Sequence, residues 1–511
     1  MQKIHKQDIV AGFVTFLIAL PLSLGIAMAS GFPPVAGLYS AIIGGLLVSR
    51  ISGSFVTING PAAGLIVIVL GAVEALGHGD PMAGYRATLA VITVSGLLLF
   101  IAGLLKGGEL SDFFPESVVH GMLAAIGVII FSKQAHIMLG VSPTGKEPAH
   151  LLAEIPHSLS VMNPEIAVIG VVSLLLLILW PKMPWKWVKR IPAPLVVVIV
   201  GMIFDRVFDL EHQHKYLFLD HHEYDLGPKF LVTLPQSIFA GITNPEWSQS
   251  GSRVFWGWVI TLTLVQGLET LLSASAVDLL DKQKRKSNLN KDLAAVGFGT
   301  AISGFIGGLP MIAEIVRSSN NINNGAKSGW SNFAHGAFML MFLILIPNLL
   351  HQIPLASLAA ILVFTGYNLA SPKHFKHALE TGTDQFFLYT ATTIVTVFTD
   401  LLIGVGTGIF LKLLLHFSAG LKPIEFVTLK TISSTEGNTV TFKTKGAAVF
   451  TNYLILKSRL KKLSADKNLV LDFSEVTVMD RTVEQKLFQF ARERESAGSR
   501  VELIGVEKRK K

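Results

Sequence analysis

The sequence contains no cysteine. A chain without cysteine has no disulfide framework, no thiolate nucleophile and no cysteine metal site. Charge is also scarce, because Asp, Glu, Lys and Arg make up 15% of the residues, against about 25% in soluble domains. A P-loop, an HExxH motif and a Ser/His/Asp set are absent as well, which argues against ATP-driven chemistry and against these hydrolytic mechanisms.

What remains is mostly apolar, since 50% of the residues are hydrophobic. Residues 9–420 form a series of apolar runs, several of which reach the roughly 20 residues needed to span a bilayer. Residues 421–511 have the composition of a soluble domain. We therefore predict a polytopic α-helical membrane domain at 1–420, in contact with lipid, and a small soluble domain at 421–511. The net charge of +8 fits basic cytoplasmic loops, and nothing indicates a nucleic-acid partner.

A coarse segmentation of the apolar region predicts fourteen membrane segments. The third and the tenth are too short to span a bilayer, as expected of half-helices. The segments are 9–30, 34–51, 60–76, 84–105, 117–140, 164–181, 192–204, 253–280, 291–306, 312–324, 332–350, 354–371, 384–399 and 401–420.

Loop charges predict the orientation of these segments. With a cytoplasmic N-terminus, the loops that follow even-numbered segments should be basic. Residues 181–190 (PKMPWKWVKR) and 281–291 (DKQKRKSNLNK) follow the sixth and eighth segments and are rich in Lys and Arg. The loop at 205–252 holds seven acidic and three basic residues, which suits the outside. We expect a bacterial inner-membrane protein with both termini in the cytoplasm.

Two Gly-Pro breaks interrupt the apolar region, at residues 57–64 (TINGPAAG) and 307–318 (GGLPMIAEIVRS). Each is followed by a short apolar run, and they fall third in the first seven segments and third in the second seven. Paired breaks of this kind are typical of transporters built from inverted repeats. Two half-helix N-termini at mid-membrane would present backbone N–H groups and positive dipole ends to one spot, which favours an anion.

The tail carries the pattern of a small α/β domain. Residues 440–443, 447–450, 469–474 and 501–505 predict strands. Residues 481–496 predict an amphipathic helix, with Val483, Leu487, Phe490 and Ala491 at helical spacing. Strands that alternate with helices indicate an α/β fold.

Motifs in the same order along the chain resemble the SulP anion transporters, which include sulfate permeases, bicarbonate transporters and prestin. Residues 18–31 (IALPLSLGIAMASG) and 33–39 (PPVAGLY) resemble the family's first-helix signature, and 58–61 (INGP) resembles the entry to its third helix. Residues 469–476 (LVLDFSEV) and 479–482 (MDRT) resemble a STAS domain. The resemblance implies a homodimer of fourteen-segment subunits, each with a core domain, a gate domain and a cytoplasmic STAS domain that is able to bind a partner.

The resemblance also implies where the anion binds, between the third and tenth helices and against the first. The implied substrate-binding residues are Leu22, Ile26, Ala62, Ala63, Ala313, Glu314, Ile315 and Val316. This wall is apolar, so we expect backbone amides to contribute most of the anion binding. The alternative is that these small residues only permit close helix packing.

Glu269 is the candidate for ion coupling. It lies in an apolar helix, where a bare carboxylate is costly and an acid is a functional hypothesis by default. It matches the acidic position of the family's eighth helix, which is tied to proton or sodium coupling. Ser273 lies one turn further on the same face and could add an oxygen ligand. The alternative is a structural carboxylate bonded to backbone.

Glu314 is an acid where an anion site would want positive charge. It could pair with Arg317 at i,i+3, or form an acidic pair with Glu269 that holds a proton, or a sodium ion if both are ionised. Prestin-like members carry an Arg near this place, which our register puts at Val316 rather than Arg317.

We expect no cofactor beyond H⁺ or Na⁺ and no metal site, and we expect a transporter rather than an enzyme.

Three functions remain open from the sequence. The first is secondary active transport of a small anion, with sulfate or bicarbonate favoured over a dicarboxylate, by elevator-type movement of the core. The second is a nucleobase-type proton symporter on the same fold. The third is a membrane sensor or scaffold in which the STAS domain binds a partner and transport is vestigial.

Overall fold

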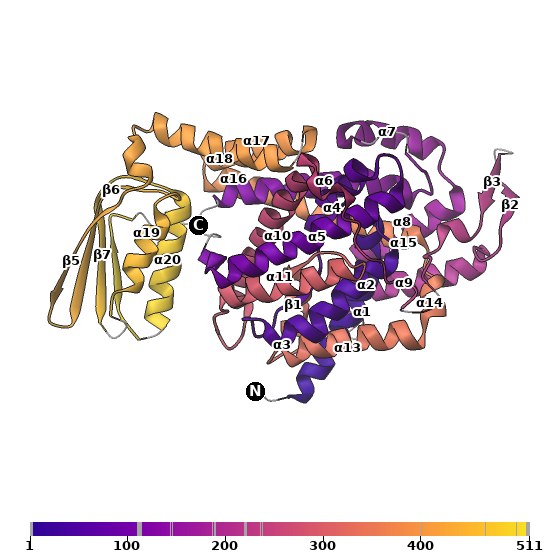
Figure 1. The fold of residues 1–511 in the computed structure, drawn as a ribbon, viewed down its shortest axis with the longest axis horizontal. Helices are drawn as coiled ribbons and strands as arrows, with labels where there is room; N and C mark the ends of the chain where they lie inside the picture. Colours follow the sequence, from indigo (N-terminus) through magenta and orange to yellow (C-terminus); the bar gives the residue numbers. More distant parts are fainter. Residues whose placement is uncertain are drawn as a thin grey trace. The chain divides into compact units, whose positions relative to one another are not determined.

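The computed structural model describes residues 4–109, 115–143, 145, 147–185, 188, 191–218, 222–235, 237, 239–399, 401–464, 467–496 and 498–506 (Figure 1). Two compact units make up the chain. The first comprises Met1–Gly108 and Leu123–Ser371, and the second comprises Glu109–Met122 and Pro372–Lys511.

All fourteen predicted membrane segments coincide with helices. Within the described residues, eight helices are long and apolar enough to cross a membrane, and the chain is a multi-pass α-helical membrane protein. The third and tenth segments are short, as predicted. In order, the helices are α1 (Lys6–Ala29), α2 (Pro34–Ile43) with its continuation to Ile51, α4 (Ile66–Gly77), α5 (Pro81–Leu104), α6 (Glu116–Met138), α8 (Pro164–Leu179), α9 (Ala193–Val207), α10 (Arg253–Leu280), α11 (Leu289–Phe305), α12 (Ile315–Asn323), α13 (Trp330–Leu345), α15 (Leu355–Leu369), α17 (Thr383–Phe398) and α18 (Leu401–Ser418).

Several elements of the first unit and its border were not predicted. Helix α7 (Pro148–Ser160) is half-buried with polar residues interspersed, and it lacks the long apolar run used to find segments. Strands β2 (His214–Leu217) and β3 (Glu223–Leu226) form an antiparallel hairpin in the acidic loop. The short helices α14 (Pro347–His351) and α16 (Pro372–Thr381) extend the segments that precede them.

Small residues allow the membrane helices to approach closely. A Cβ atom added at Gly297 of α11 would lie 2.7 Å from the carbonyl oxygen of Gly96 on α5. A Cβ atom at Gly336 of α13 would lie 2.7 Å from Cα of Gly45. Such contacts are the usual means of helix association in lipid, where apolar packing alone gives little preference for protein over hydrocarbon.

The second unit contains a four-stranded sheet in the order β5-β6-β7-β8; strands β5, β6 and β7 are labelled in Figure 1. Its strands are β5 (Lys430–Glu436), β6 (Thr439–Ala448), β7 (Asn468–Met479) and β8 (Val501–Ile504). The β5–β6 pair is antiparallel, whereas β6–β7 and β7–β8 are parallel. Helices α19 (Tyr453–Lys461) and α20 (Arg481–Ser496) lie along the sheet and share its apolar core. The predicted α/β character of the tail is present.

The strands predicted at 440–443 and 447–450 are one continuous strand, β6, so that division was wrong. The pairing with β7 shifts register between Lys443 and Lys445 and again between Gly446 and Ala447. Gly446 has φ 89°, a left-handed conformation typical of bulges. The break in the apolar pattern at this place therefore marks a bulge within a strand rather than a turn between two.

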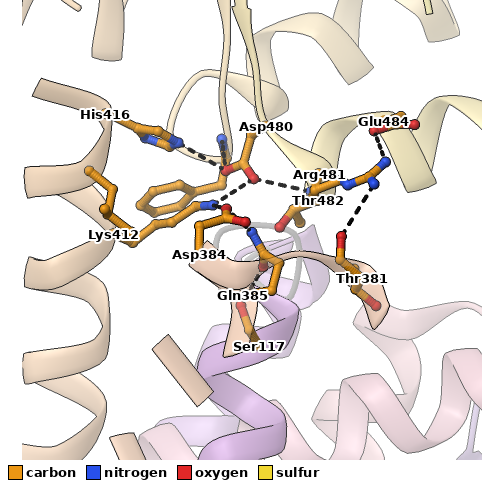
Figure 2. Close-up of polar contacts among 12 residues, drawn as sticks. Ser117, Thr381, Asp384, Gln385, Lys412, His416, Asp480, Arg481, Thr482 and Glu484 are labelled. Carbon is orange, nitrogen blue, oxygen red and sulfur yellow. Dashed lines mark hydrogen bonds and ion pairs between the residues drawn. The ribbon is translucent and has the colours of Figure 1, made fainter. Parts of the chain in front are cut away.

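Polar contacts within the second unit tie the sheet domain to membrane helices (Figure 2). Asp480, at the end of β7, is fully buried, and its carboxylate lies 3.1 Å from Nζ of Lys412 on α18. Nε2 of His416, one turn further along α18, lies 3.7 Å from the same carboxylate. The guanidinium of Arg481 donates to the carbonyl oxygen of Thr381 on α16 at 3.2 Å. The tail is thus held by a buried ion pair, by the neighbouring contact of His416 and by the hydrogen bond of Arg481.

Candidate functional site

The two Gly-Pro breaks meet as a short antiparallel ribbon inside the first unit. Strand β1 (Ile58–Pro61) pairs with β4 (Met311–Glu314), so that Ile58 faces Glu314 and Pro61 faces Met311. β1 leads through Ala62 and the 3-10 turn Ala63–Leu65 into α4, and β4 leads directly into α12. Because the strands run in opposite directions, the two half-helices begin at opposite ends of one ribbon.

The predicted alanines lie at or before these helix starts. Ala62 is extended, at φ −111° and ψ 139°, and precedes the first turn, in which Ala63 is the first residue. Ala313 lies in β4 opposite Asn59 and is fully buried. It therefore belongs to the ribbon rather than to the free end of α12. The first turn of each half-helix leaves N–H groups without a partner inside the helix.

Ile315 and Val316 form the accessible apolar surface of the second half-helix start. They are 40% and 67% exposed, whereas Ala62 is 2% exposed. Helix α1 packs against β1, α4 and α12. On that helix Ile26 is buried and Leu22 is partly buried. The predicted substrate-binding residues therefore come together around the ribbon, but their side chains differ widely in exposure.

Glu269 of α10 lies directly against the first half-helix. A Cβ atom added at Gly64 would lie 2.5 Å from Oε2 of Glu269 and would overlap its Oε1. Glu269 is 6% exposed, and its Oε1 has no hydrogen-bond partner among the residues that the structure describes. A glycine at position 64 therefore provides the space that this carboxyl group occupies, and the carboxyl group is not bonded to the backbone of its own helix.

Glu314 lies close enough to Glu269 for their charges to interact. It is 9% exposed and is the residue that precedes α12. The side chain of Arg317 reaches the end of β1. It is fully buried, and its Nη2 donates to the carbonyl oxygen of Pro61 at 3.2 Å. Among the described residues no carboxylate lies within ion-pair distance of Arg317, but its charge and that of Glu314 still interact. Glu314 therefore interacts electrostatically with both Glu269 and Arg317, and both pairings remain predictions.

Gln266 is a residue that the sequence analysis missed. It is fully buried one turn before Glu269, and its Nε2 donates to Oγ1 of Thr300 at 2.6 Å and to the carbonyl oxygen of Met311 at 2.7 Å. It thereby fixes α10 to α11 and to the first residue of β4. Its place on the same apolar helix as Glu269 was the available signal.

Ser273 is buried on α10, and no hydrogen bond joins it to Glu269 among those in the described chain.

A set of buried amides and hydroxyls supports the ribbon from behind. Oγ of Ser318 accepts from the backbone N–H of Ile58 at 2.9 Å and donates to the carbonyl oxygen of Glu314. Nδ2 of Asn332 donates to Oδ1 of Asn59 at 3.0 Å. Backbone groups in a membrane must find partners within the protein, and these side chains supply them where helix geometry is interrupted.

The arrangement combines two interrupted helices that start on one ribbon, an apolar accessible surface and two neighbouring buried acids. Non-helical backbone at this depth is tolerated where it is enclosed by protein or lines a cavity. Discontinuous helices in corresponding positions of two halves are the hallmark of secondary transporters. The fold and the site thus define a polytopic membrane transporter.

Comparison with known proteins identifies the family. Residues 6–392 match the model of the sulfate permease family, and the chain belongs to that family. Its members are transporters of anions such as sulfate and bicarbonate, not enzymes.

Curated relatives match most of the chain. The Bacillus subtilis (strain 168) protein named "Putative sulfate transporter YvdB" is 30% identical over 80% of this chain and 73% of its own length. The "Bicarbonate transporter BicA" of Picosynechococcus sp. is 25% identical over 85% of this chain and 75% of its own.

Solved structures share the fold. The transmembrane domain of a cyanobacterial bicarbonate transporter, BicA, superposes with a TM-score of 0.68 at 24% identity and covers 79% of this chain and 99% of its own. The overall structure of SLC26A9 superposes with a TM-score of 0.70 at 15% identity and covers 98% of this chain and 84% of its own. The second match includes the tail.

Proposed function

We propose that this chain is a secondary active transporter of sulfate or bicarbonate in a bacterial inner membrane, and that it works by elevator-type movement of a core domain against a gate. The anion would bind at the starts of α4 and α12. Unpaired N–H groups and helix dipoles there favour negative charge.

The strongest support for the proposal is the position of Glu269 relative to the two half-helices. Both half-helices begin on the β1–β4 ribbon, and the carboxyl group of Glu269 is enclosed against the first of them at Gly64. In a coupled transporter, binding of the driving ion must affect binding of the substrate. This arrangement places an ionisable group beside the backbone that would hold the anion. A purely structural carboxylate would be expected to accept hydrogen bonds, whereas Oε1 of Glu269 accepts none from the described part of the chain.

Among coupling ions, the arrangement favours a proton. The charges of Glu269 and Glu314 interact, and the charge of Arg317 acts on Glu314 from beyond ion-pair distance. Two enclosed carboxyl groups are most readily accommodated when they share one proton. A sodium ion would need both acids ionised and several oxygen ligands around them, which is a more demanding arrangement than one shared proton.

The test is uptake of labelled sulfate and of labelled bicarbonate into proteoliposomes under an imposed pH gradient, an imposed Na⁺ gradient, or neither. We expect an inward proton gradient to drive uptake of one of the two anions in the wild type, and Glu269→Gln to abolish the gradient-driven component. Glu74→Gln is the matched control, because Glu74 is an exposed acid on α4 and should leave uptake unchanged.

Other outcomes would decide between alternatives. Uptake driven by Na⁺ alone would replace the proton in the proposal. Competition by uracil but by neither anion would favour the nucleobase symporter, and no uptake of any of these would favour a sensor or scaffold.

We also propose that residues 421–511 form a cytoplasmic STAS domain and that the protein acts as a homodimer, with both termini in the cytoplasm. The sheet order, its two helices and the whole-length fold match support the STAS assignment. Cross-linking in native membranes tests the dimer, and accessibility of an introduced cysteine at Lys467 from either side tests the orientation.

A further inference from the structure

A cavity in the first unit is lined by none of the residues of the β1–β4 ribbon. It has a volume of about 380 Å³, which is within the range of sites for organic ligands and far larger than an inorganic anion requires. It lies between the C-terminal half of α1, the end of α6 with the loop that follows, the 3-10 turn Pro228–Phe230 and the start of α15. None of the residues predicted to bind the transported anion lines it.

The walls of this cavity are apolar along their length. Met28 of α1, Ile137 of α6 and Leu355, Leu358 and Leu362 of α15 contribute side chains. Leu358 and Leu362 are at most 2% exposed, so the inner part is enclosed. A ligand that filled it would need an apolar body, because burying a polar group against these walls without a partner is unfavourable.

Positive charge lies at the mouth and is not balanced by an acid. Lys229 and Ser142 are exposed residues of the lining. No carboxylate lines the cavity, and Lys229 makes no ion pair within the described part of the chain. Its ammonium group is 5.0 Å from the ring of Phe230, a neighbour that also lines the cavity. The mouth therefore complements a negatively charged group.

The inner part contains one polar side chain that lacks a partner. Gln134 of α6 is 4% exposed, lines the cavity and makes no hydrogen bond in the described structure. The amide of Gln134 is not among the fully buried side-chain atoms that lack a partner in the described residues, so it is open to the cavity and available to a polar group of a ligand. Gln134 precedes the last residue of α6, Met138, by four residues, which is roughly 6 Å along the helix axis. The amide and the mouth are thus at different depths.

We propose that this cavity is a binding site for an amphipathic organic anion. The anionic head binds Lys229 and Ser142 at the mouth, the apolar body lies along α15, and a hydroxyl or similar polar group at the far end bonds Gln134. The site is distinct from the transport site, and the inference does not depend on which anion the protein carries or on how transport is driven.

The probe is 6-hydroxy-2-naphthoate, whose carboxylate and hydroxyl stand at opposite ends of a rigid apolar body. Its binding to the full-length protein in detergent is measured by isothermal titration calorimetry, with a titration into empty micelles subtracted. Two truncated probes separate the ends: 2-naphthol lacks the carboxylate, and 2-naphthoate lacks the hydroxyl.

Three variants complete the test. We expect Lys229→Gln to lower the affinity for 6-hydroxy-2-naphthoate and for 2-naphthoate roughly tenfold, because one charged hydrogen bond is lost. The affinity for 2-naphthol should not change. Gln134→Leu should reduce the affinity for 6-hydroxy-2-naphthoate to no more than that for 2-naphthoate. Lys215→Gln, an exposed lysine of the β2–β3 hairpin, should change nothing.

Absence of binding of 6-hydroxy-2-naphthoate to the wild type at millimolar concentration would overturn the proposal. So would binding that is indifferent to Lys229→Gln, because it would place the probe at the transport site or in the micelle. The thermal unfolding midpoint of each variant is recorded beforehand. If Gln134→Leu does not fold, Lys229→Gln and the three probes still decide the matter, since Lys229 is on the surface.

Discussion

At the scale of single residues, the account depends on how Glu269 fits against Gly64. An acid in an apolar helix is visible in the sequence, and it was singled out there. The glycine that makes room for it was seen only as part of a Gly-Pro break, because the need for that glycine comes from a side chain on a distant helix. The same holds for Gln266. It hydrogen-bonds to Thr300 and Met311, and no local sequence pattern connects these residues to it.

Gly64→Ala should disable transport without preventing folding. The added Cβ atom overlaps Glu269, so the carboxyl group must move or the half-helix must shift, at a cost of about 1–3 kcal/mol. We expect gradient-driven uptake to fall at least roughly tenfold, since about 1.4 kcal/mol at the transition state is a factor of ten. Gly257→Ala on α10 is the control, because no atom lies within 4 Å of a Cβ added there. Equal uptake by both variants would remove the Glu269–Gly64 contact from the mechanism.

Gln266→Leu should loosen the ribbon. It leaves the carbonyl oxygen of Met311 without the amide that donates to it at 2.7 Å, and an unsatisfied buried group costs about 1–3 kcal/mol. The thermal unfolding midpoint should fall and the KM for the anion should rise. Ser275→Ala is a suitable comparison, since Oγ of Ser275 bonds only within its own helix. If the two variants behave alike, the α10–β4 bond has no special role.

At the scale of elements, the helices were predictable and the ribbon was not. Long apolar runs and Gly-Pro breaks are local signals, and every predicted segment coincides with a helix. The β1–β4 pairing joins two four-residue stretches from opposite halves of the chain, which are too short for alternation of polar and apolar residues to show. Helix α7 and the β2–β3 hairpin were missed for a related reason, because they lie in loops where no apolar run marks them.

Asn332→Leu tests the support behind the ribbon. Nδ2 of Asn332 donates to Oδ1 of Asn59 at 3.0 Å, and Asn332 is 1% exposed. Its replacement by an apolar residue of similar size should lower stability by about 1–3 kcal/mol and reduce uptake. Asn324→Leu, at an exposed amide that bonds only to Asn320, serves as the reference. An unchanged midpoint for Asn332→Leu would show that the ribbon does not need this bond.

At the scale of the whole molecule, the contacts inside the second unit connect the sheet domain to the membrane helices that belong with it. The sequence predicted the α/β tail from its alternating pattern, but it did not predict the ion pair of Lys412 with Asp480 (Figure 2). Lys412 lies within the apolar run of α18, and this run gave no sign that its side chain has a partner in the tail. Asp480 also accepts the backbone N–H of Thr482 at 3.2 Å, so one carboxylate both caps α20 and binds α18.

Lys412→Met should destabilise the second unit strongly. The substitution leaves Asp480 fully buried without its nearest cation, and removing one partner of a buried pair costs about 3–5 kcal/mol. Limited proteolysis of the full-length protein should then cut the tail faster, and the double variant Lys412→Met with Asp480→Asn should recover part of the loss. Lys445→Met is the control, because its pair with Glu475 is exposed and worth at most about 1 kcal/mol. Equal proteolysis rates for the two single variants would contradict this account of the tail.

The central claim is that the carboxyl group of Glu269 couples a driving ion to anion movement. The measurement that tests it most directly is proton-gradient-driven uptake of labelled sulfate and bicarbonate by wild type and Glu269→Gln in matched proteoliposomes. We predict that the wild type accumulates one of these anions against its gradient and that Glu269→Gln only equilibrates it or does not carry it. Accumulation by Glu269→Gln equal to that of the wild type would contradict the account.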